Sequence, residues 1–474
     1  MLFSSVTFLY YFLPITLLVY YVVPKNWKNA ILFLASFLFY FWGEPKYSLL
    51  MAVSILTGYL GGYAIEKARK CENEKLAKAA MTGSVGILLG FLAVFKYTDF
   101  GITTINHFTG SDIPLVKLAL PIGISFYTFQ ILSYVVDVYR KDVPLERNII
   151  NFGAYVVMFP QLIAGPIVRF KDVQIELRER TLSVEKTARG IERFVIGLAK
   201  KVLIADLLGE FVQSMDVVQG KSALMLWVVA LAYAMQIYFD FSGYSDMAIG
   251  LGRMLGFHFP ENFDYPYVSK NITEFWRRWH MTLGGWFRDY VYIPLGGSRV
   301  SFVKWLRNVF VVWFLSGLWH GASWNFVLWG VYFGVILALE KLFLKKWLEK
   351  LPAVLQHLYA ILLVVISFVI FRLENLSEVG AYLAGMFGLG RGTTPSGAGI
   401  ALEAYQMQSY GAIIAMAVVI ALGIPKWIWE QFMKLEWGRR MAKIVCPVSY
   451  LLLLLVVTAF LIQSSVHPFL YFRF

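Results

Sequence analysis

Residues 446–464 read CPVSYLLLLLVVTAFLIQS, an apolar run without a charged side chain. A helix needs about 20 such residues to cross the hydrocarbon core of a bilayer. Similar runs recur along the chain, and they give further candidate spans near 6–24, 29–44, 47–66, 82–98, 117–137, 189–214, 223–245, 308–340, 353–372 and 409–425. The pattern therefore predicts an all-α, polytopic membrane bundle of about 11 spans, forming one domain over residues 1–474.

The composition agrees with a membrane protein. Of the 474 residues, 58% are hydrophobic, 17% are aromatic and 15% are charged, whereas soluble chains carry roughly 25% charged residues. These values exclude a soluble enzyme, a disordered tail and a small disulfide scaffold. The net charge of +13 is assigned to basic cytoplasmic loops rather than to nucleic-acid binding. Cys71 and Cys446 provide neither a disulfide framework nor a metal site, so no metal is expected.

Basic residues orient the predicted spans. Lys and Arg follow the first, third and fifth spans, at 25–28, 67–78 and 140–141. Because cytoplasmic loops carry an excess of positive charge, this pattern places the N-terminus and the tail after Ile462 outside the cytoplasm. The N-terminus lacks a basic n-region and a cleavage site, so we expect a first membrane helix rather than a signal peptide. Four long basic segments are expected to be cytoplasmic: 169–201, 253–307, 341–350 and 426–444.

Two apolar stretches are interrupted. The stretch 150–167 is short and contains Pro160 and Gly165, so it is expected to be re-entrant or interfacial. The stretch 309–339 must begin and end on the cytoplasmic side, and as a straight helix it would be roughly 46 Å long. It is therefore expected to form a bent hairpin, with its turn near 317–323.

His320 is the most informative single residue. It lies within a long apolar stretch, between Gly317 and Gly321. A titratable side chain at membrane depth is costly and is a functional candidate for that reason, and the glycines allow backbone or a ligand to approach closely. With an ordinary pKa near ~6.5, a histidine can take a proton from a hydroxyl group. The alternative is a buried structural histidine that bonds a carbonyl group.

A second histidine, His280, lies in the segment 274–290. Helical spacing predicts one apolar face of an interfacial helix, which a break at Gly284-Gly285 would divide in two. The residues of this face are Trp276, Trp279, His280, Leu283, Phe287 and Tyr290. His280 is expected to point toward the bundle, and an incidental histidine is the alternative. Three arginines on the other faces are expected to meet donor phosphates or, for most of them, lipid head groups: Arg277, Arg278 and Arg288.

Two acidic residues occur where an apolar span ends, in the run 238–246. Asp240 and Asp246 are expected either to line a polar cavity, where they would contact substrate, or to cap the next helix. The remaining histidines are assigned no role: His107, His258, His357 and His467.

Three motifs together resemble those of the membrane-bound O-acyltransferases, and in particular the bacterial alginate O-acetylation and teichoic acid D-alanylation proteins. They are Leu318-Trp319-His320-Gly321, Trp276-Arg277-Arg278-Trp279-His280 and the segment 289–297, which reads DYVYIPLGG. The similarity covers nearly the whole chain, from Phe3-Ser4-Ser5 through residues 160–166 to the tail.

The resemblance implies a helical bundle around a central funnel. It makes His320 the catalytic histidine and His280 the family's second active-site residue. Trp276, Trp279 and Trp319 are then expected to contact the substrates.

The tail, residues 464–474, carries a further similarity. Its end, His467–Phe474, is similar to the aromatic C-terminal motif of the small membrane peptide of D-alanylation systems. There the motif's tyrosine is thought to accept the acyl group before a second transferase takes it, and the resemblance gives Tyr471 this role. The alternative is that these aromatic residues only favour a membrane interface.

By this resemblance the protein is an O-acyltransferase of the bacterial inner membrane with no permanently bound cofactor. The implied donor is a cytoplasmic thioester, acetyl-CoA or an acyl carrier protein, and acetyl is the expected group. The implied partners are membrane lipids, an extracytoplasmic acyltransferase of hydrolase fold and a polysaccharide acceptor. Four alternatives stay open: a transporter or flippase of an acylated precursor, a D-alanyl transferase served by a carrier protein, acylation of a lipid or protein, and a non-catalytic scaffold.

Overall fold

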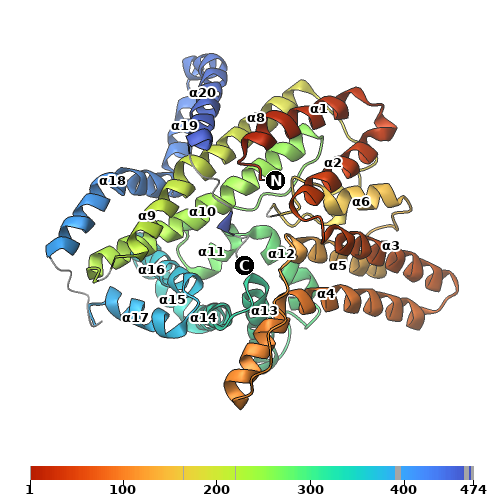
Figure 1. Ribbon diagram of the computed structural model, residues 1–474, viewed down its shortest axis with the longest axis horizontal. Coiled ribbons are helices and arrows are strands. Elements are labelled where there is room, and N and C mark those ends of the chain that lie inside the picture. The colour runs from red at the N-terminus through yellow and green to blue at the C-terminus, as the bar shows by residue number, and fades with distance from the viewer. Residues whose placement is uncertain (1, 164, 219, 390–396, 464–468, 471–474) are drawn as a thin grey trace. The chain divides into compact units, whose positions relative to one another are not determined.

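The computed structural model describes residues 2–163, 165–218, 220–389, 397–463 and 469–470. These residues form helices and connecting segments, and no β-strand occurs among them (Figure 1). The predicted all-α class is therefore confirmed. The chain divides into two compact units, residues 1–194 with 245–260 and residues 195–244 with 261–474. The single domain over 1–474 stays a prediction.

The first unit contains the N-terminal helices, the last residues of α10 and the segment that follows them up to Pro260. Its helices are η1 (Phe8–Phe12), α1 (Leu13–Val22), η2 (Lys25–Trp27), α2 (Lys28–Gly43), α3 (Ser48–Lys70), α4 (Glu74–Thr109), α5 (Ile124–Arg140), α6 (Ile149–Val157), α7 (Phe170–Val173) and most of α8 (Val184–Ala199).

The second unit contains both candidate histidines. Its helices are η3 (Lys200–Ala205), α9 (Asp206–Asp216), α10 (Ala223–Met254), η4 (Pro266–Val268), α11 (Ile272–Arg278), α12 (Met281–Phe287), η5 (Arg288–Tyr292), α13 (Phe302–His320), α14 (Trp324–Leu339), η6 (Glu340–Leu344), α15 (Lys345–Leu348), α16 (Ala353–Arg372), α17 (Leu376–Met386), α18 (Gly397–Ala421), α19 (Ile424–Lys434) and α20 (Glu436–Gln463). Buried side chains of α9, α10, α14 and α16 form its core.

Seven helices of the described residues are long and apolar enough to cross a membrane: α3, α4, α10, Trp324–Leu348, α16, Gly399–Ala421 and α20. The first predicted span corresponds to a shorter apolar helix, Phe8–Val22. The chain is thus a multi-pass membrane protein, while the predicted number of about 11 spans is not confirmed.

The predicted span 117–137 begins later than expected. Helix α5 starts at Ile124, because Gly123 before it has a φ of 75°. Glycine adopts this left-handed conformation without steric cost. A Cβ atom at Gly123 would also lie 2.7 Å from the carbonyl oxygen of Leu162, so only glycine fits at this turn.

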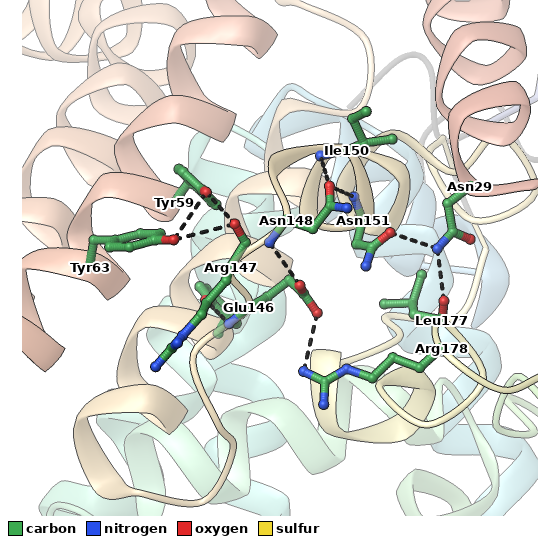
Figure 2. A network of polar contacts seen from close by, with 11 residues as sticks. Asn29, Tyr59, Tyr63, Glu146, Arg147, Asn148, Ile150, Asn151, Leu177 and Arg178 are labelled. Carbon is green, nitrogen blue, oxygen red and sulfur yellow. Dashed lines mark hydrogen bonds and ion pairs between the residues drawn. The ribbon is translucent and has the colours of Figure 1, made fainter. Parts of the chain in front are cut away.

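Within the stretch 150–167, the described residues form a short helix followed by irregular buried backbone. Asn148 begins α6, because its Oδ1 accepts hydrogen bonds from the backbone of Ile150 at 2.8 Å and of Asn151 at 3.3 Å (Figure 2). After Val157 the helix stops, and Phe159 lies fully buried in the segment that follows.

The same corner of the first unit holds a chain of polar contacts. Glu146 accepts a hydrogen bond from the backbone of Asn148 at 2.9 Å and pairs with Arg178 at 3.4 Å (Figure 2). Asn29 of α2 donates to the side chain of Asn151 at 2.7 Å. These contacts fix the start of α6 against α2.

Candidate active site

The predicted hairpin is present and positions His320. Helix α13 ends at His320 and α14 begins at Trp324, so the turn falls inside the predicted bend (Figure 1). A Cβ atom at Gly317 would overlap the carbonyl group of Phe326, and one at Gly321 would overlap the ring of Phe326. The two glycines therefore allow the helices to pack closely on either side of the turn.

The imidazole of His320 is buried among aromatic rings. It is 4% exposed, and its ring lies 5.0 Å from Trp319, 5.0 Å from Trp329 and 5.4 Å from Phe371, each in an edge-to-face arrangement. Such packing restricts the orientation of the ring.

The structure corrects the prediction for segment 274–290. The expected common helical face does not exist, because the helix breaks before His280 rather than at the two glycines. Helix α11 ends at Arg278, and His280 adopts a left-handed conformation with φ 43° and ψ 52° before α12 begins at Met281. Trp276 of α11 and the apolar residues of α12 therefore belong to two separate helices.

A loop residue that the sequence did not single out stabilises this break. The backbone carbonyl of Asn262 accepts a hydrogen bond from Met281 N at 3.0 Å. Its side-chain Oδ1 contacts His280 Nδ1 at 3.0 Å, Thr282 N at 3.3 Å and Thr282 Oγ1 at 2.8 Å. Asn262 is 1% exposed. No spacing or composition signal distinguishes it from other loop residues.

The environment of His280 keeps its ring neutral. The side chain is 1% exposed, and burial lowers its pKa from 6.5 to about 3, because a charged imidazole would lose its hydration. Its Nε2 is buried and has no hydrogen-bond partner among the residues that the structure describes. A neutral ring at this position has the capacity to accept one more hydrogen bond.

The rings of both histidines contact the ring of Trp319. The ring of Trp319 is 5.9 Å from His280 and 5.0 Å from His320, measured between ring centroids. The structure thus gathers His280, Trp319 and His320, three residues that the sequence had selected, in one buried cluster.

A cavity of about 170 Å³ adjoins His280. Its walls come from α11, α12, η5 and α13, and they are apolar apart from His280, Arg288, Tyr292 and Ser316. The indole of Trp276 lines it and is held by Trp313 at 4.8 Å and Phe333 at 4.9 Å. Within the described part of the chain, the buried Nε1 of Trp276 has no hydrogen-bond partner.

The other predicted residues of this region lie elsewhere. Trp279 is 4% exposed and packs in the core against Phe263 at 5.1 Å and Phe368 at 5.4 Å, rather than in the cavity. Arg278 is engaged with Asp264 and Glu274, at 3.1 Å each.

The remaining two arginines, Arg277 and Arg288, differ from Arg278 in their surroundings. Arg277 is exposed. Arg288 pairs with Asp289 at 2.7 Å and lines the cavity. Among the three arginines, Arg288 is therefore the one that lines the cavity.

Comparison with known proteins identifies the family of this chain. The sequence model described as MBOAT, membrane-bound O-acyltransferase family, matches residues 118–377, which include both histidines. The chain belongs to this family. The resemblance that the motifs predicted is thereby confirmed, and the protein is an acyltransferase.

Named relatives of this acyltransferase agree. The chain is 44% identical to the probable alginate O-acetylase AlgI of Pseudomonas aeruginosa, over 82% of this chain and 75% of that protein. It is 40% identical to the protein of the same name from Pseudomonas putida, with 100% of both chains covered. It is 34% identical to the peptidoglycan O-acetyltransferase of Helicobacter pylori, over 82% of this chain and 80% of that protein.

The two predicted acidic residues of the acyltransferase have ion-pair partners. Asp246 is contacted by two guanidinium nitrogens of Arg193, both at 2.6 Å. Asp240 is 2% exposed and pairs with the buried Lys201 at 2.6 Å, and Lys201 also contacts Asp206 at 2.7 Å. These contacts explain why acids are tolerated in an apolar helix.

Asp240 also binds the end of the chain. Its Oδ2 accepts a hydrogen bond from the backbone N–H of Leu470 at 2.8 Å. Phe469 beside it is 3% exposed and packs on Tyr244 at 5.0 Å and Phe241 at 6.0 Å. Tyr471 itself lies outside the described residues.

Proposed function

We propose that this acyltransferase moves an acetyl group from a cytoplasmic thioester to hydroxyl groups of an extracytoplasmic polysaccharide. The proposed donor is acetyl-CoA or an acyl carrier protein. The observation that carries the proposal is the pair of buried histidines, His280 and His320, whose rings both contact Trp319. His280 also lines a small cavity. The relatives named for alginate and peptidoglycan O-acetylation support acetyl as the group and a polysaccharide as the acceptor.

In the proposed reaction, His320 takes the proton of the acceptor hydroxyl while the hydroxyl oxygen attacks the thioester carbonyl. The new C–O bond forms, the C–S bond breaks, and the leaving thiolate receives the proton from His320. General-base help of this kind contributes about 10²–10⁴-fold to the rate. His280 is the second active-site residue, and its neutral ring suits a positioning role.

The cavity supports a short acyl group. At about 170 Å³, with Leu283, Phe287 and Val312 among its walls, it offers a small apolar space beside His280. The alkyl part of a short acyl group would bury its apolar surface against these side chains. Arg288 lines the same cavity, and its guanidinium group suits contact with the phosphates of a nucleotide donor.

We further propose that the tail takes part as an acyl carrier. Tyr471 would accept the group as a phenyl ester, and an extracytoplasmic acyltransferase of hydrolase fold would pass it to the polymer. A phenol has a pKa near ~10, so its ester is a better acyl donor than an alkyl ester. The proposed location is the bacterial inner membrane with both termini outside the cytoplasm.

The variant His320→Ala tests this function. We expect a folded, membrane-inserted protein whose transfer of labelled acetyl to the envelope polymer falls about 10²-fold or more, because the base is missing. The measurement is the ester-linked acid released from purified polymer by mild alkali, in cells where this protein is the sole acyltransferase of its kind.

The matched control is His107→Ala, which removes an exposed histidine of α4 and should leave transfer unchanged. Near-normal acylation by His320→Ala would exclude His320 as the base. Release of D-alanine instead of acetate would replace acetyl with the D-alanyl alternative.

A further inference from the structure

The break at His280 raises the question of which ring nitrogen carries the proton. The Oδ1 atom of Asn262 is contacted by Thr282 N, a backbone N–H that can only donate. The contacted atom must therefore be the amide oxygen of Asn262 and not its nitrogen. The same oxygen faces His280 Nδ1 at 3.0 Å.

An amide oxygen only accepts hydrogen bonds, so His280 must donate from Nδ1. In a neutral imidazole the other nitrogen then carries a lone pair and no proton. This other nitrogen, Nε2, is buried and has no partner among the described residues. The ring can thus accept a hydrogen bond from a substrate through Nε2, and it cannot donate one to the oxygen of a developing tetrahedral intermediate.

We propose that Asn262 is a positioning residue of the acyltransferase, which holds His280 as the Nδ1–H tautomer so that Nε2 accepts a hydrogen bond from a substrate. The assignment of a substrate to Nε2 rests on the proposed function, whereas the tautomer does not. Two backbone features also support the proposal. His280 has a left-handed backbone conformation, and Met281 N donates a hydrogen bond to Asn262 O, so the backbone that carries the His280 ring lies next to the loop of Asn262.

The first test is spectroscopic and needs no activity. Full-length protein in detergent, labelled with ¹⁵N in its six histidine rings, gives separate Nδ1 and Nε2 signals, and His280→Gln identifies those of His280. We expect a protonated Nδ1 and an unprotonated Nε2 at both about pH 6 and about pH 8. A protonated Nε2 in the wild-type protein would overturn the proposal.

The second test uses Asn262→Leu, which removes the acceptor at similar size. We expect His280 to lose its single tautomer and acetyl transfer to fall about 10²-fold or more, since a ring protonated at Nε2 can no longer accept a hydrogen bond from a substrate there. Asn262→Asp retains the acceptor oxygen and should preserve the Nδ1–H tautomer and more of the transfer than Asn262→Leu.

The matched control is Thr282→Val. It removes another hydrogen bond to the same oxygen, at 2.8 Å, without changing the contact to His280. We expect it to keep the tautomer and to retain transfer within about threefold. If Asn262→Leu kept either the tautomer or the activity of Thr282→Val, Asn262 would not be a positioning residue. If His320→Ala stayed active while the tautomer was as expected, only the proposed function would fail.

Discussion

His280 carries two unfavourable features at once. Its φ of 43° is unusual for a residue with a side chain, and such a backbone costs of order 1–3 kcal/mol. Its ring is buried as well, and burial penalises the charged form. The loop at Asn262 offsets both costs with hydrogen bonds to the ring and to the following backbone. Strain of this kind is retained where it orients a reactive group.

Burial of His280 predicts a specific acid sensitivity. The ring titrates near ~6.5 in the unfolded chain, whereas in the folded protein its pKa is about 3. Between these two values the unfolded chain binds the additional proton, so stability is lost as the pH falls below 6.5, by up to ~1.4 kcal/mol per pH unit. His280→Gln should remove this contribution.

The measurement is the apparent Tm in detergent at about pH 7.5 and about pH 5.5, on either side of the ordinary histidine pKa. The wild-type protein should lose more than His280→Gln over this interval. His107→Gln, which changes an exposed histidine, should behave like the wild-type protein. An equal loss in all three proteins would contradict the burial argument.

At the scale of the elements, the two histidine segments show what a sequence can predict. The α13–α14 hairpin was predicted from span length and from the charge pattern, because a 31-residue apolar stretch whose ends are both expected on the cytoplasmic side has few other solutions, and the structure confirms the break between the two helices. The break before His280 did not follow from its local pattern. It depends on hydrogen bonds to Asn262, which lies in another loop, and helical periodicity carries no information about such a partner.

The packing of this hairpin predicts the effect of a single methyl group. Gly317→Ala would place a Cβ atom against the carbonyl group of Phe326, so the helices must separate. Overpacking of this kind costs about 1–3 kcal/mol. We expect a lower apparent Tm and reduced acyl transfer, because His320 lies on the next turn of α13.

The control for this change is Gly380→Ala in α17. A Cβ atom there would meet no atom of the described residues within 4 Å, and alanine favours a helix over glycine by about 1 kcal/mol. This variant should keep or raise the apparent Tm and leave transfer unchanged. A Gly317→Ala protein with the stability of the control would show that close helix packing does not hold the hairpin together.

At the scale of the whole molecule, the sequence indicated a helical membrane protein and its family, because composition and motifs are global signals. The sequence did not indicate the partners of the buried acidic side chains. Asp240 was expected to face substrate or cap a helix; the structure pairs it with Lys201 and with the backbone of Leu470, and its contact with substrate stays a prediction. Both partners are remote in sequence, so no local pattern encodes them. The orientation of the termini stays a prediction.

The anchored tail gives the last prediction. Phe469 packs on Tyr244 and the backbone of Leu470 donates to Asp240, and Tyr471 is the next residue in the sequence. If Tyr471 carries the acyl group, Tyr471→Phe removes the oxygen that forms the ester while keeping the aromatic ring. Polymer acylation should then fall to the level of His320→Ala, because both variants block the same transfer.

The measurement combines polymer acylation with mass spectrometry of the C-terminal peptide, which should carry an acyl group in the wild-type protein and none in Tyr471→Phe. Tyr405→Phe, which changes an exposed tyrosine of α18, is the matched control and should retain full transfer. Full activity of Tyr471→Phe would exclude the relay but would leave His320 in place as the base. Direct transfer to the polymer would then be required, and the contacts of Asp240 with Leu470 would have only a structural role.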